Sequence, residues 1–408
     1  MSPLHAWTLC TLLFFASALS FLDRQVLSVL APQLIAEFGM SNTEYSRVVF
    51  AFVLSYTVMF SVGGKLMDRM GTSWGLGSAV TLWSLASAAH AWAAGPWGLG
   101  IARFLLGVGE GACFPAVTKG AVEWMPQARR ALAISFANGG SAFGAVVAPP
   151  LTAWTTLRFG WKGAFLGTAI LGLVWLLGWI LATRKLPRAQ KSSAATVQST
   201  ELTPLWKRKQ MRRLMAARFL FDPVFYFYMF WIPQYLARER GYSLQDIGNQ
   251  TWIPFFVLGV ANLLAGGASD RLARGADHPK RVRLGLMLAA ALLTPASCLA
   301  PFTPSSGMAI ALLSLLMFAH GFWITNFITL IGDAIEPSKL GAAVGLTGTC
   351  GGIAGMISNL IIGPCVDRFG FVPLFLAMAL LYPMAWSILA TGGFWSPNPA
   401  KRTIEYAN

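Results

Sequence analysis

The chain has 408 residues, of which 55% are hydrophobic and 12% are charged, and its net charge at pH 7 is +15. A soluble domain of this length does not need so large an apolar fraction, so the composition excludes an ordinary soluble protein and indicates an integral membrane protein. The excess of Lys and Arg would suggest nucleic-acid binding in a soluble chain. Here it gathers in loops between apolar segments, so we expect no nucleic-acid partner.

Twelve apolar segments, each long enough to cross a bilayer as a helix, follow one another along the chain. They are continuous apolar runs without alternation, which predicts an all-α membrane protein and excludes a β-barrel. The first segment carries Asp23 and Arg24 and is too long for a cleavable signal peptide, so we expect a permanent helix. The segments are 7–31, 46–67, 75–94, 97–121, 129–155, 162–183, 213–237, 246–268, 283–302, 306–330, 339–364 and 370–393.

Basic residues mark alternate loops of this predicted bundle. Lys and Arg dominate the connections between helices 4 and 5, 6 and 7, and 8 and 9, whereas the opposite loops are short and poor in charge. Cytoplasmic loops carry such an excess, so we expect both termini in the cytoplasm. Residues 184–212 include the polar run AQKSSAATVQST, which predicts a linker between an N-terminal half, 1–183, and a C-terminal half, 213–408.

A short motif occurs once in each half. GGKLMDRMG, at 63–71, follows the second predicted helix, and GGASDRLARG, at 266–275, follows the eighth. An internal repeat at matching places of two halves is typical of secondary transporters. The residues of these loops that we expect to serve gating or structure are Gly64, Asp68, Arg69, Gly71, Asp270 and Arg271.

With these features the chain resembles the major facilitator superfamily. The two halves, the basic central loop and the loop motif carry the resemblance, together with RFLLGVGEGACFP at 103–115, which is similar to an Arg-x-x-x-Gly-x-Gly pattern of that superfamily. The loop motif departs from the family pattern, because Thr72, Ser73 and Trp74 stand where a basic cluster is usual. The resemblance implies two pseudo-symmetric six-helix halves, and we expect a monomer.

Several stretches are similar to one branch of the superfamily, the anion:cation symporters that carry sugar acids such as hexuronates and galactonate. They are FLDRQVLSVLAPQL (21–34), GVGEGACFPA (107–116), FGAVVAPPLTAW (143–154), RFLFDPVFYFYMFWIPQYL (218–236) and, less closely, AHGFWITNFITLIGD (319–333). This resemblance implies alternating access with a small organic anion as substrate.

Four charged residues lie well inside the first and fourth predicted helices, away from the ends. A charge there costs about 2.5–3.5 kcal/mol or more, so it usually has a partner or a function. At about 1.5 Å of rise per residue, Asp23 and Arg103 lie at similar depths, roughly 24 and 26 Å from the cytoplasmic side, and Glu110 roughly 15 Å from it. We expect Asp23 to face Arg103. Glu110 has no cation nearby on its own helix, and we expect it and Asp23 to couple transport to protons.

Asp23 and Arg24 point about 100° apart, so both cannot face a central cavity squarely. In the resembled fold, helices 1, 4, 7 and 10 line that cavity, and we assign Arg24 to it. The guanidinium fork of Arg24 matches a substrate carboxylate, and Arg103 is a second candidate for substrate binding. The alternative is that Asp23, Arg24 and Arg103 form only a structural ion-pair cluster. Whether Asp23 or Glu110 is the main proton carrier stays open.

Uncharged side chains could complete a pocket for a hydroxyl-rich substrate. Helix 10 carries a stripe of His320, Trp323 and Asn326, spaced three apart. Each could instead pack against lipid or bond across a helix interface, and Asp222 could cap helix 7 or face the cavity. The other candidates for substrate binding are Tyr56, Asn138, Tyr226 and Asn359.

Two Gly-x-x-x-Gly pairs, Gly140 with Gly144 and Gly351 with Gly355, occupy equivalent places in the fifth and eleventh predicted helices. Such pairs let helices approach closely. We expect them at the interface between the halves, where rocking must occur.

The sequence thus predicts a proton-coupled symporter of the inner or plasma membrane that imports a sugar acid or another monocarboxylate. We expect a proton gradient as driving force, with no metal or cofactor, because the five cysteines lack metal-ligand spacing. An exchanger, an exporter and a non-transporting membrane sensor on the same fold remain alternatives. We expect no enzyme, since no His-Glu-x-x-His, Ser-centred elbow or paired-aspartate signature appears in the spans.

Overall fold

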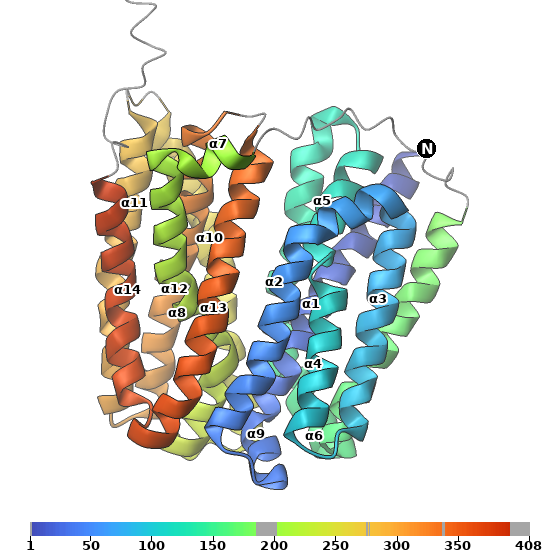
Figure 1. The fold of residues 1–408 in the computed structure, drawn as a ribbon, viewed down its shortest axis with the longest axis vertical. Coiled ribbons are helices and arrows are strands. Elements are labelled where there is room, and N and C mark those ends of the chain that lie inside the picture. The colour runs from blue at the N-terminus through green and yellow to red at the C-terminus, as the bar shows by residue number, and fades with distance from the viewer. Residues whose placement is uncertain (1, 185–201, 275, 277, 337–338, 392–408) are drawn as a thin grey trace, which may run out of the picture. The chain divides into compact units, whose positions relative to one another are not determined.

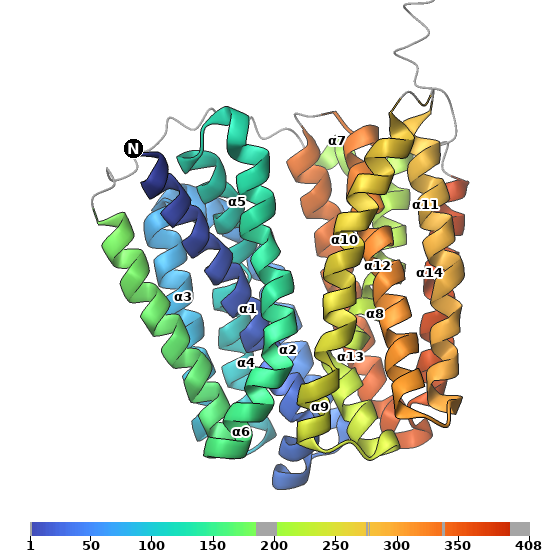
Figure 2. The ribbon, with the colours of Figure 1, turned by 180° about the vertical axis from the view of Figure 1, so that it is seen from behind.

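The structure, a computed structural model, describes residues 2–184, 202–274, 276, 278–336 and 339–391. Every regular element over these residues is a helix (Figures 1 and 2), which confirms the all-helical part of the predicted fold class. The elements are α1 Pro3–Phe38, α2 Asn42–Met70, α3 Thr72–Ala89, η1 His90–Trp92, α4 Pro96–Glu110, α5 Cys113–Trp124, η2 Gln127–Arg129, α6 Arg130–Thr183, α7 Leu202–Lys207, α8 Lys209–Arg240, α9 Leu244–Gln250, α10 Trp252–Ala273, α11 Pro279–Leu293, η3 Thr294–Phe302, α12 Ser306–Ala334, α13 Leu340–Phe369 and α14 Val372–Ala390.

Nine helical stretches in the described part of the chain are long and apolar enough to cross a membrane. One of them contains α6, which turns back at Gly160 (φ 72°, ψ 171°) and so forms two arms (Figure 2). A positive φ favours glycine, which explains why the turn falls there. The arms match the predicted segments 129–155 and 162–183, and α3 and α8 match two further predicted segments. The number twelve itself stays a prediction.

The described helices belong to two compact units. Unit 1 consists of Met1–Val197, Tyr226–Phe256 and Gly355–Phe371, and unit 2 of Gln198–Phe225, Val257–Ala354 and Val372–Asn408. In unit 1, α1 packs along α6, and α2 packs along α4. In unit 2, α11 packs along α12, and η3 packs on α12 and α14. The predicted halves divide the chain at other points, and they stay a prediction.

Hydrogen bonds tie the segments 226–256 and 355–371 to the N-terminal helices inside unit 1. Ser28 donates to the carbonyl oxygen of Met229 at 2.7 Å, and the Tyr45 hydroxyl donates to that of Phe230 at 2.9 Å. These bonds explain why the compact unit extends beyond residue 197.

A carboxylate of α13 caps the first turn of α2 in the same unit. The two oxygens of Asp367 accept hydrogen bonds from the main-chain and side-chain groups of Asn42, at 3.0 and 2.8 Å, and of Thr43, at 2.8 and 2.6 Å. Gln234 of α8 adds a bond to the Asn42 side chain at 3.3 Å. The N-terminal N–H groups of a helix lack partners within it and carry partial positive charge, so a carboxylate is stabilising there. We call these contacts of Asp367 the α2 latch.

The end of the predicted linker 184–212 is helical where the structure describes it. α7 covers Leu202–Lys207, and α8 begins at Lys209 rather than at residue 213. Leu, Lys, Arg, Gln and Met all favour helices, which accounts for the early start. The remainder of the predicted linker, 185–201, lies outside the described residues.

The two Gly-x-x-x-Gly pairs allow close contacts within each predicted half, and their place at the interface between the halves stays a prediction. A Cβ at Gly140 or Gly144 would collide with the main chain of α1 at Phe14 or Ala18. In α13, a Cβ at Gly351 would meet the Asp222 carboxylate of α8, and one at Gly355 would meet the ring of Tyr226 of α8. Each pair therefore lies where one helix packs closely on another helix of the same predicted half. A spacing of four residues marks a close-packing face, but it does not identify the helix that packs there.

Gly140→Ala is expected to lower the thermal stability of the purified protein strongly. The added methyl would meet the carbonyl oxygen of Phe14 in a backbone that cannot give way, and overpacking of this kind costs about 1–3 kcal/mol or more. Gly139→Ala is the matched control, since a Cβ there has no atom of the described residues within 4 Å. Thermal unfolding in detergent compares the two variants, and equal midpoints would contradict the packing assigned to Gly140.

Candidate functional site

The glycines of RFLLGVGEGACFP seat α4 closely on its neighbours and so place its two charged residues. A Cβ at Gly107 would collide with Ser55 and with the main chain of Phe52, both on α2. A Cβ at Gly109 would come within 2.7 Å of Trp83 on α3. Larger residues would push α4 away from α2 and α3. The motif therefore positions Arg103 and Glu110, which lie on the same α4 helix.

A buried ion pair joins Arg24 of α1 to Glu110 of α4. Nε of Arg24 lies 2.8 Å from Oε2 of Glu110, and the Glu110 side chain is fully buried. Ser20, one turn before Arg24, donates to the same carboxylate oxygen at 3.1 Å and accepts from Nη2 of Arg24 at 3.2 Å. Oε1 of Glu110 has no hydrogen-bond partner among the residues described. Glu110 appeared isolated in the sequence because its cation is 86 residues away, on another helix.

Arg103 lies deep in unit 1, with a relative exposure of 1%, and it binds main-chain oxygens. Its Nη1 donates to the carbonyl oxygens of Asp23 and Arg24 at 3.4 and 3.5 Å. No ion pair joins the side chains of Arg103 and Asp23 in the described part of the chain, so the predicted pairing is wrong. Nε and Nη2 of Arg103 have no partner within the same residues. Since an unpaired buried donor costs about 1–3 kcal/mol, these groups require water or a ligand.

The carboxylate of Asp23 points to α3 instead. Oδ1 accepts a hydrogen bond from Ser87 at 2.8 Å, and Ser87 in turn lies 2.8 Å from the hydroxyl of Thr168 on α6. Oδ2 of Asp23 has no partner among the residues that are described. Two adjacent residues of a helix point about 100° apart, so Arg24 faces Glu110 while Asp23 faces these hydroxyls.

Aromatic rings surround the guanidinium of Arg24. Its Cζ lies 4.2 Å from the ring centre of Tyr56, 4.7 Å from that of Phe21 and 5.5 Å from that of Phe52. Phe52 contacts Phe230, whose ring stacks on Tyr226 with centres 6.1 Å apart. Tyr56 and Tyr226, both predicted from sequence, therefore belong to one aromatic cluster of unit 1 around Arg24.

The other uncharged candidates make internal bonds. Asn359 accepts from the Trp231 indole at 2.9 Å and donates to the Gly355 carbonyl oxygen at 2.8 Å. Asn138 donates to a carbonyl oxygen of its own helix at 3.0 Å. Both sets of bonds lie in unit 1, and they fit a packing role as well as a binding one.

The predicted stripe of helix 10 lies on α12 in unit 2. His320 bonds the Tyr382 hydroxyl through Nδ1, and Asn326 accepts from Ser269 at 2.6 Å. Trp323 is fully buried against Tyr382, with ring centres 5.1 Å apart. The structure thus gives each member of the stripe a packing partner within unit 2.

Asp222 also has a partner within unit 2, which sequence reasoning did not single out. Arg218, one turn earlier on α8, lies 2.8 Å from the Asp222 carboxylate through Nε. Its Cζ lies 5.5 Å from the ring centre of Phe221. The spacing of four residues between opposite charges would have predicted this pair.

The repeated loop motif places an acidic residue next to a cation in each copy. Asp68 lies 2.6 Å from Nζ of Lys119, and Asp270 lies 3.8 Å from Nη1 of Arg283. Gly71 has a φ of 77° between α2 and α3, so this position needs glycine. Arg69 and Arg271 are exposed. A Cβ added at Gly64 would have no atom of the described residues within 4 Å.

Three hydroxyl residues of the site were missed from sequence: Ser20, Ser87 and Thr168. Small hydroxyl residues are common in membrane helices, so their identity alone carried no signal. Ser20 could have been found, because it lies four residues before Arg24 and so on the same helix face.

Comparison with known proteins provides independent evidence about the family of this chain. The family model "Major Facilitator Superfamily" matches residues 13–359. The chain is 28% identical to the hexuronate transporter of Escherichia coli (strain K12), over 98% of this chain and 96% of that one. It is 26% identical to the D-galactonate transporter of Escherichia coli O6:H1, over 93% and 94%.

Among solved structures, the fold is similar to that of a bacterial homolog to the human lysosomal transporter Spinster in an inward-facing, unoccupied conformation. The TM-score is 0.75, with 18% identity and 97% of each chain covered. At that identity the likeness supports the fold alone.

Proposed function

Because the chain belongs to the Major Facilitator Superfamily, a family of membrane transporters, we propose that it is a proton-coupled symporter that imports a small organic anion by alternating access. The substrate class that we propose is the sugar acids, hexuronates or aldonates. The printed names of the two relatives, a hexuronate transporter and a D-galactonate transporter, support that class.

The observation that carries the proposal is the charge balance of four buried side chains. Asp23, Arg24, Arg103 and Glu110 are at most 7% exposed, and their ionised forms sum to zero. A substrate carboxylate entering this cluster adds one negative charge, which is costly in a medium of low dielectric constant. One proton on Asp23 or Glu110 restores neutrality. The cluster therefore favours an anion that moves together with a proton.

The ion pair between Arg24 and Glu110 offers a way to link proton binding to substrate binding. While Glu110 is ionised, it occupies Nε of Arg24. Protonation of Glu110 removes that charge, and the Arg24 fork can then hold a substrate carboxylate in two parallel hydrogen bonds. Arg103, with its unpartnered Nε and Nη2 among the described residues, strengthens the positive potential beside Arg24. Tyr56 and Tyr226 supply rings for the C–H face of a sugar.

Uptake by purified protein in liposomes tests this function. We expect labelled hexuronates and aldonates to accumulate above equilibrium under an inward proton gradient, and collapse of the gradient by an ionophore to stop accumulation. Uptake that needs a second organic anion inside the vesicles, and ignores the gradient, would instead establish an exchanger. Binding without any movement of label would identify a sensor.

We further propose that the protein lies in the inner membrane as a monomer with both termini in the cytoplasm. Ala128, in η2 beside Arg129 and Arg130, and Ala94, in the loop before α4, are both exposed. In a variant without native cysteines, we expect Ala128→Cys to be protected from an impermeant thiol reagent outside intact cells, and Ala94→Cys to be labelled. The excess of basic residues beside Ala128 gives this orientation, and the reverse pattern of labelling would invert it.

A further inference from the structure

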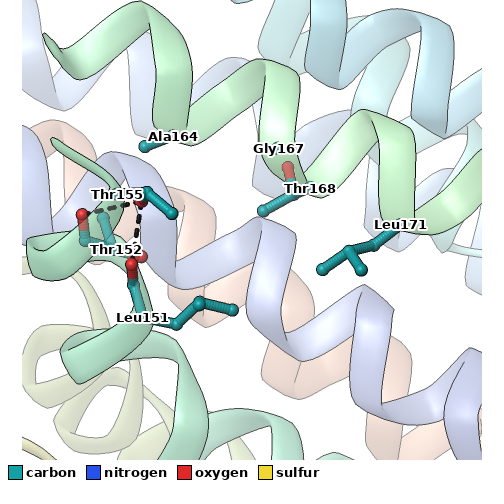
Figure 3. Close-up of a pocket in the computed structure, with 7 residues that line it drawn as sticks. All are labelled: Leu151, Thr152, Thr155, Ala164, Gly167, Thr168 and Leu171. Carbon is teal, nitrogen blue, oxygen red and sulfur yellow. Dashed lines mark hydrogen bonds between the residues drawn. The ribbon is translucent and has the colours of Figure 1, made fainter. Parts of the chain in front are cut away.

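A cavity lies between the two arms of α6, close to their turn at Gly160. Its volume is about 210 Å³, and Leu151, Thr152, Thr155, Ala164, Gly167, Thr168 and Leu171 line it. Figure 3 shows that these residues come from both arms, with Leu151, Thr152 and Thr155 on one and Ala164, Gly167, Thr168 and Leu171 on the other. Thr168 lies eight residues after Gly160, which is roughly 12 Å of helix rise, so the cavity is near one end of unit 1.

The cavity has room for water. A buried water molecule needs about 10–15 Å³ of space for its centre and two to four polar partners. Thr152 is 2% exposed, and its hydroxyl has no hydrogen-bond partner in the part of the chain described. The Thr155 hydroxyl bonds carbonyl oxygens of its own arm at 2.8 and 3.0 Å, and those oxygens can accept further bonds (Figure 3). Thr152 therefore contributes a buried hydroxyl without a described partner to the residues that line the cavity.

A chain of two hydroxyls leads from this cavity to Asp23. Thr168, a wall residue, lies 2.8 Å from Ser87 through their hydroxyl oxygens, and either can be the donor. Ser87 lies 2.8 Å from Oδ1 of Asp23. The main-chain oxygen of Phe165 accepts from both hydroxyls, at 3.4 and 3.1 Å, so each has an alternative direction for its proton. The side chains of Asp23, Ser87 and Thr168 are each at most 5% exposed.

We propose that Ser87 and Thr168 relay protons between water in this cavity and the carboxylate of Asp23. A hydronium ion in the cavity gives a proton to the Thr168 oxygen, and Thr168 passes its own hydroxyl proton to Ser87. Ser87 then passes its proton to Oδ1 of Asp23, so that water and a neutral carboxylic acid remain. The hydroxyls reset by turning towards Phe165. This inference rests on the proton coupling proposed above.

The other ionisable groups near Asp23 do not offer an equivalent route. Arg103 presents Nη1 to the main chain of Asp23, and Arg24 and Glu110 bond each other on another side of α1. His90 of η1 stacks on Phe165 with ring centres 4.6 Å apart and binds the carbonyl oxygen of Ala86. The relay hydroxyls are therefore the bonded connection from Asp23 to the cavity.

The test compares Thr168→Val, which keeps the shape and removes the hydroxyl, with Thr168→Ser, which keeps the hydroxyl. We expect Thr168→Val to slow gradient-driven uptake by about tenfold or more, since a positioned proton-transfer group contributes at least that much. Thr168→Ser should stay near the wild-type rate. Counterflow exchange of substrate at low pH on both sides, where Asp23 stays protonated, should be unchanged in both. The solvent isotope effect on uptake should rise in Thr168→Val.

Thr183→Val is the matched control, because Thr183 lies on the same helix and its hydroxyl bonds, among the described residues, a carbonyl oxygen of that helix at 2.8 Å. Filling the cavity provides a second test that leaves the hydroxyls in place. A Cβ at Gly167 has no atom within 4 Å, so Gly167→Leu can extend into the cavity, and Gly285→Leu serves as its control. We expect Gly167→Leu to slow gradient-driven uptake and to spare counterflow.

Three outcomes would overturn the relay. Wild-type uptake by Thr168→Val, when Asp23→Asn abolishes accumulation, would reject the relay and leave the coupling in place. Equal loss of uptake and counterflow in Thr168→Val would assign Thr168 a structural role. Unchanged uptake by Gly167→Leu would show that the cavity is not the route. Undiminished accumulation by Asp23→Asn would instead remove Asp23 from the proposed coupling, which is a separate failure.

Discussion

Glu110→Gln is expected to abolish accumulation of substrate under a proton gradient while leaving counterflow exchange partly intact. Gln has nearly the same shape, still accepts a hydrogen bond from Nε of Arg24, and stays neutral at every pH. The variant therefore resembles a permanently protonated Glu110, which binds substrate and cannot release the proton. Uptake into liposomes with an inward proton gradient, followed by counterflow without one, measures the two activities separately.

Glu37→Gln is the control for this substitution, because Glu37 is an exposed carboxylate at the far end of α1. It should behave as the wild type in both assays. Undiminished uphill transport by Glu110→Gln would remove Glu110 from the proton path and leave Asp23 as the carrier. Loss of both activities would point to the charge of Glu110 as a requirement for binding.

Arg24→Lys is expected to weaken substrate binding about ten- to hundredfold. Lys keeps the positive charge that Glu110 requires, but it lacks the planar fork for two parallel bonds to a carboxylate. Loss of one charge-assisted bond costs about 1.5–3 kcal/mol, which is the stated change in affinity. Arg24→Ala is a poorer test, because it leaves the Glu110 charge buried without its partner. Calorimetric titration of the purified variants with a sugar acid measures the effect.

The control is Arg158→Lys, at an exposed position of α6, which should bind as the wild type does. A second comparison separates the anchor from a structural ion pair. If Arg24 holds the substrate carboxylate, the wild type should bind the acid far more tightly than its amide. Equal affinities for acid and amide would defeat the anchor, and Arg24 would then serve only to balance Glu110.

The sequence predicted which charged residues lie deep in the helices, but it did not predict how they pair. Depth follows from counting residues along a helix, which is why Asp23, Arg103 and Glu110 were all expected inside the bundle. Pairing depends on the rotation of each helix and on its neighbours, which no local pattern records. The glycines of α4 set its packing on α2 and α3, Arg24 of α1 pairs with Glu110 of α4, and Asp23 meets Ser87 of α3.

For the uncharged candidates too, the sequence predicted positions but not contacts. A polar stripe such as His320, Trp323 and Asn326 is visible by its spacing, yet the spacing does not distinguish a ligand contact from a bond to another helix. The structure gives His320 and Asn326 partners in Tyr382 and Ser269. Conversely, Ser87 and Thr168 became notable only when their hydroxyls were found 2.8 Å apart beside a buried acid.

The α2 latch has a consequence for the unloaded protein. Its four hydrogen bonds join residue 367 to residues 42 and 43, and each is worth about 0.5–1.5 kcal/mol net, towards the lower value at exposed Thr43. At about 0.5 kcal/mol for each Thr43 bond and up to about 1.5 kcal/mol for each Asn42 bond, the four bonds contribute about 2–4 kcal/mol, which is less than the roughly 5.5 kcal/mol needed to move two states from 1:99 to 99:1. If the alternating access proposed above opens this end of unit 1, these four bonds must break in every cycle. In that case the empty protein favours the state with the latch made, and a substrate that arrives at this end finds the open state only as a minority of the population. The apparent affinity there is lower than the intrinsic affinity by that same fraction, whatever the binding residues contribute.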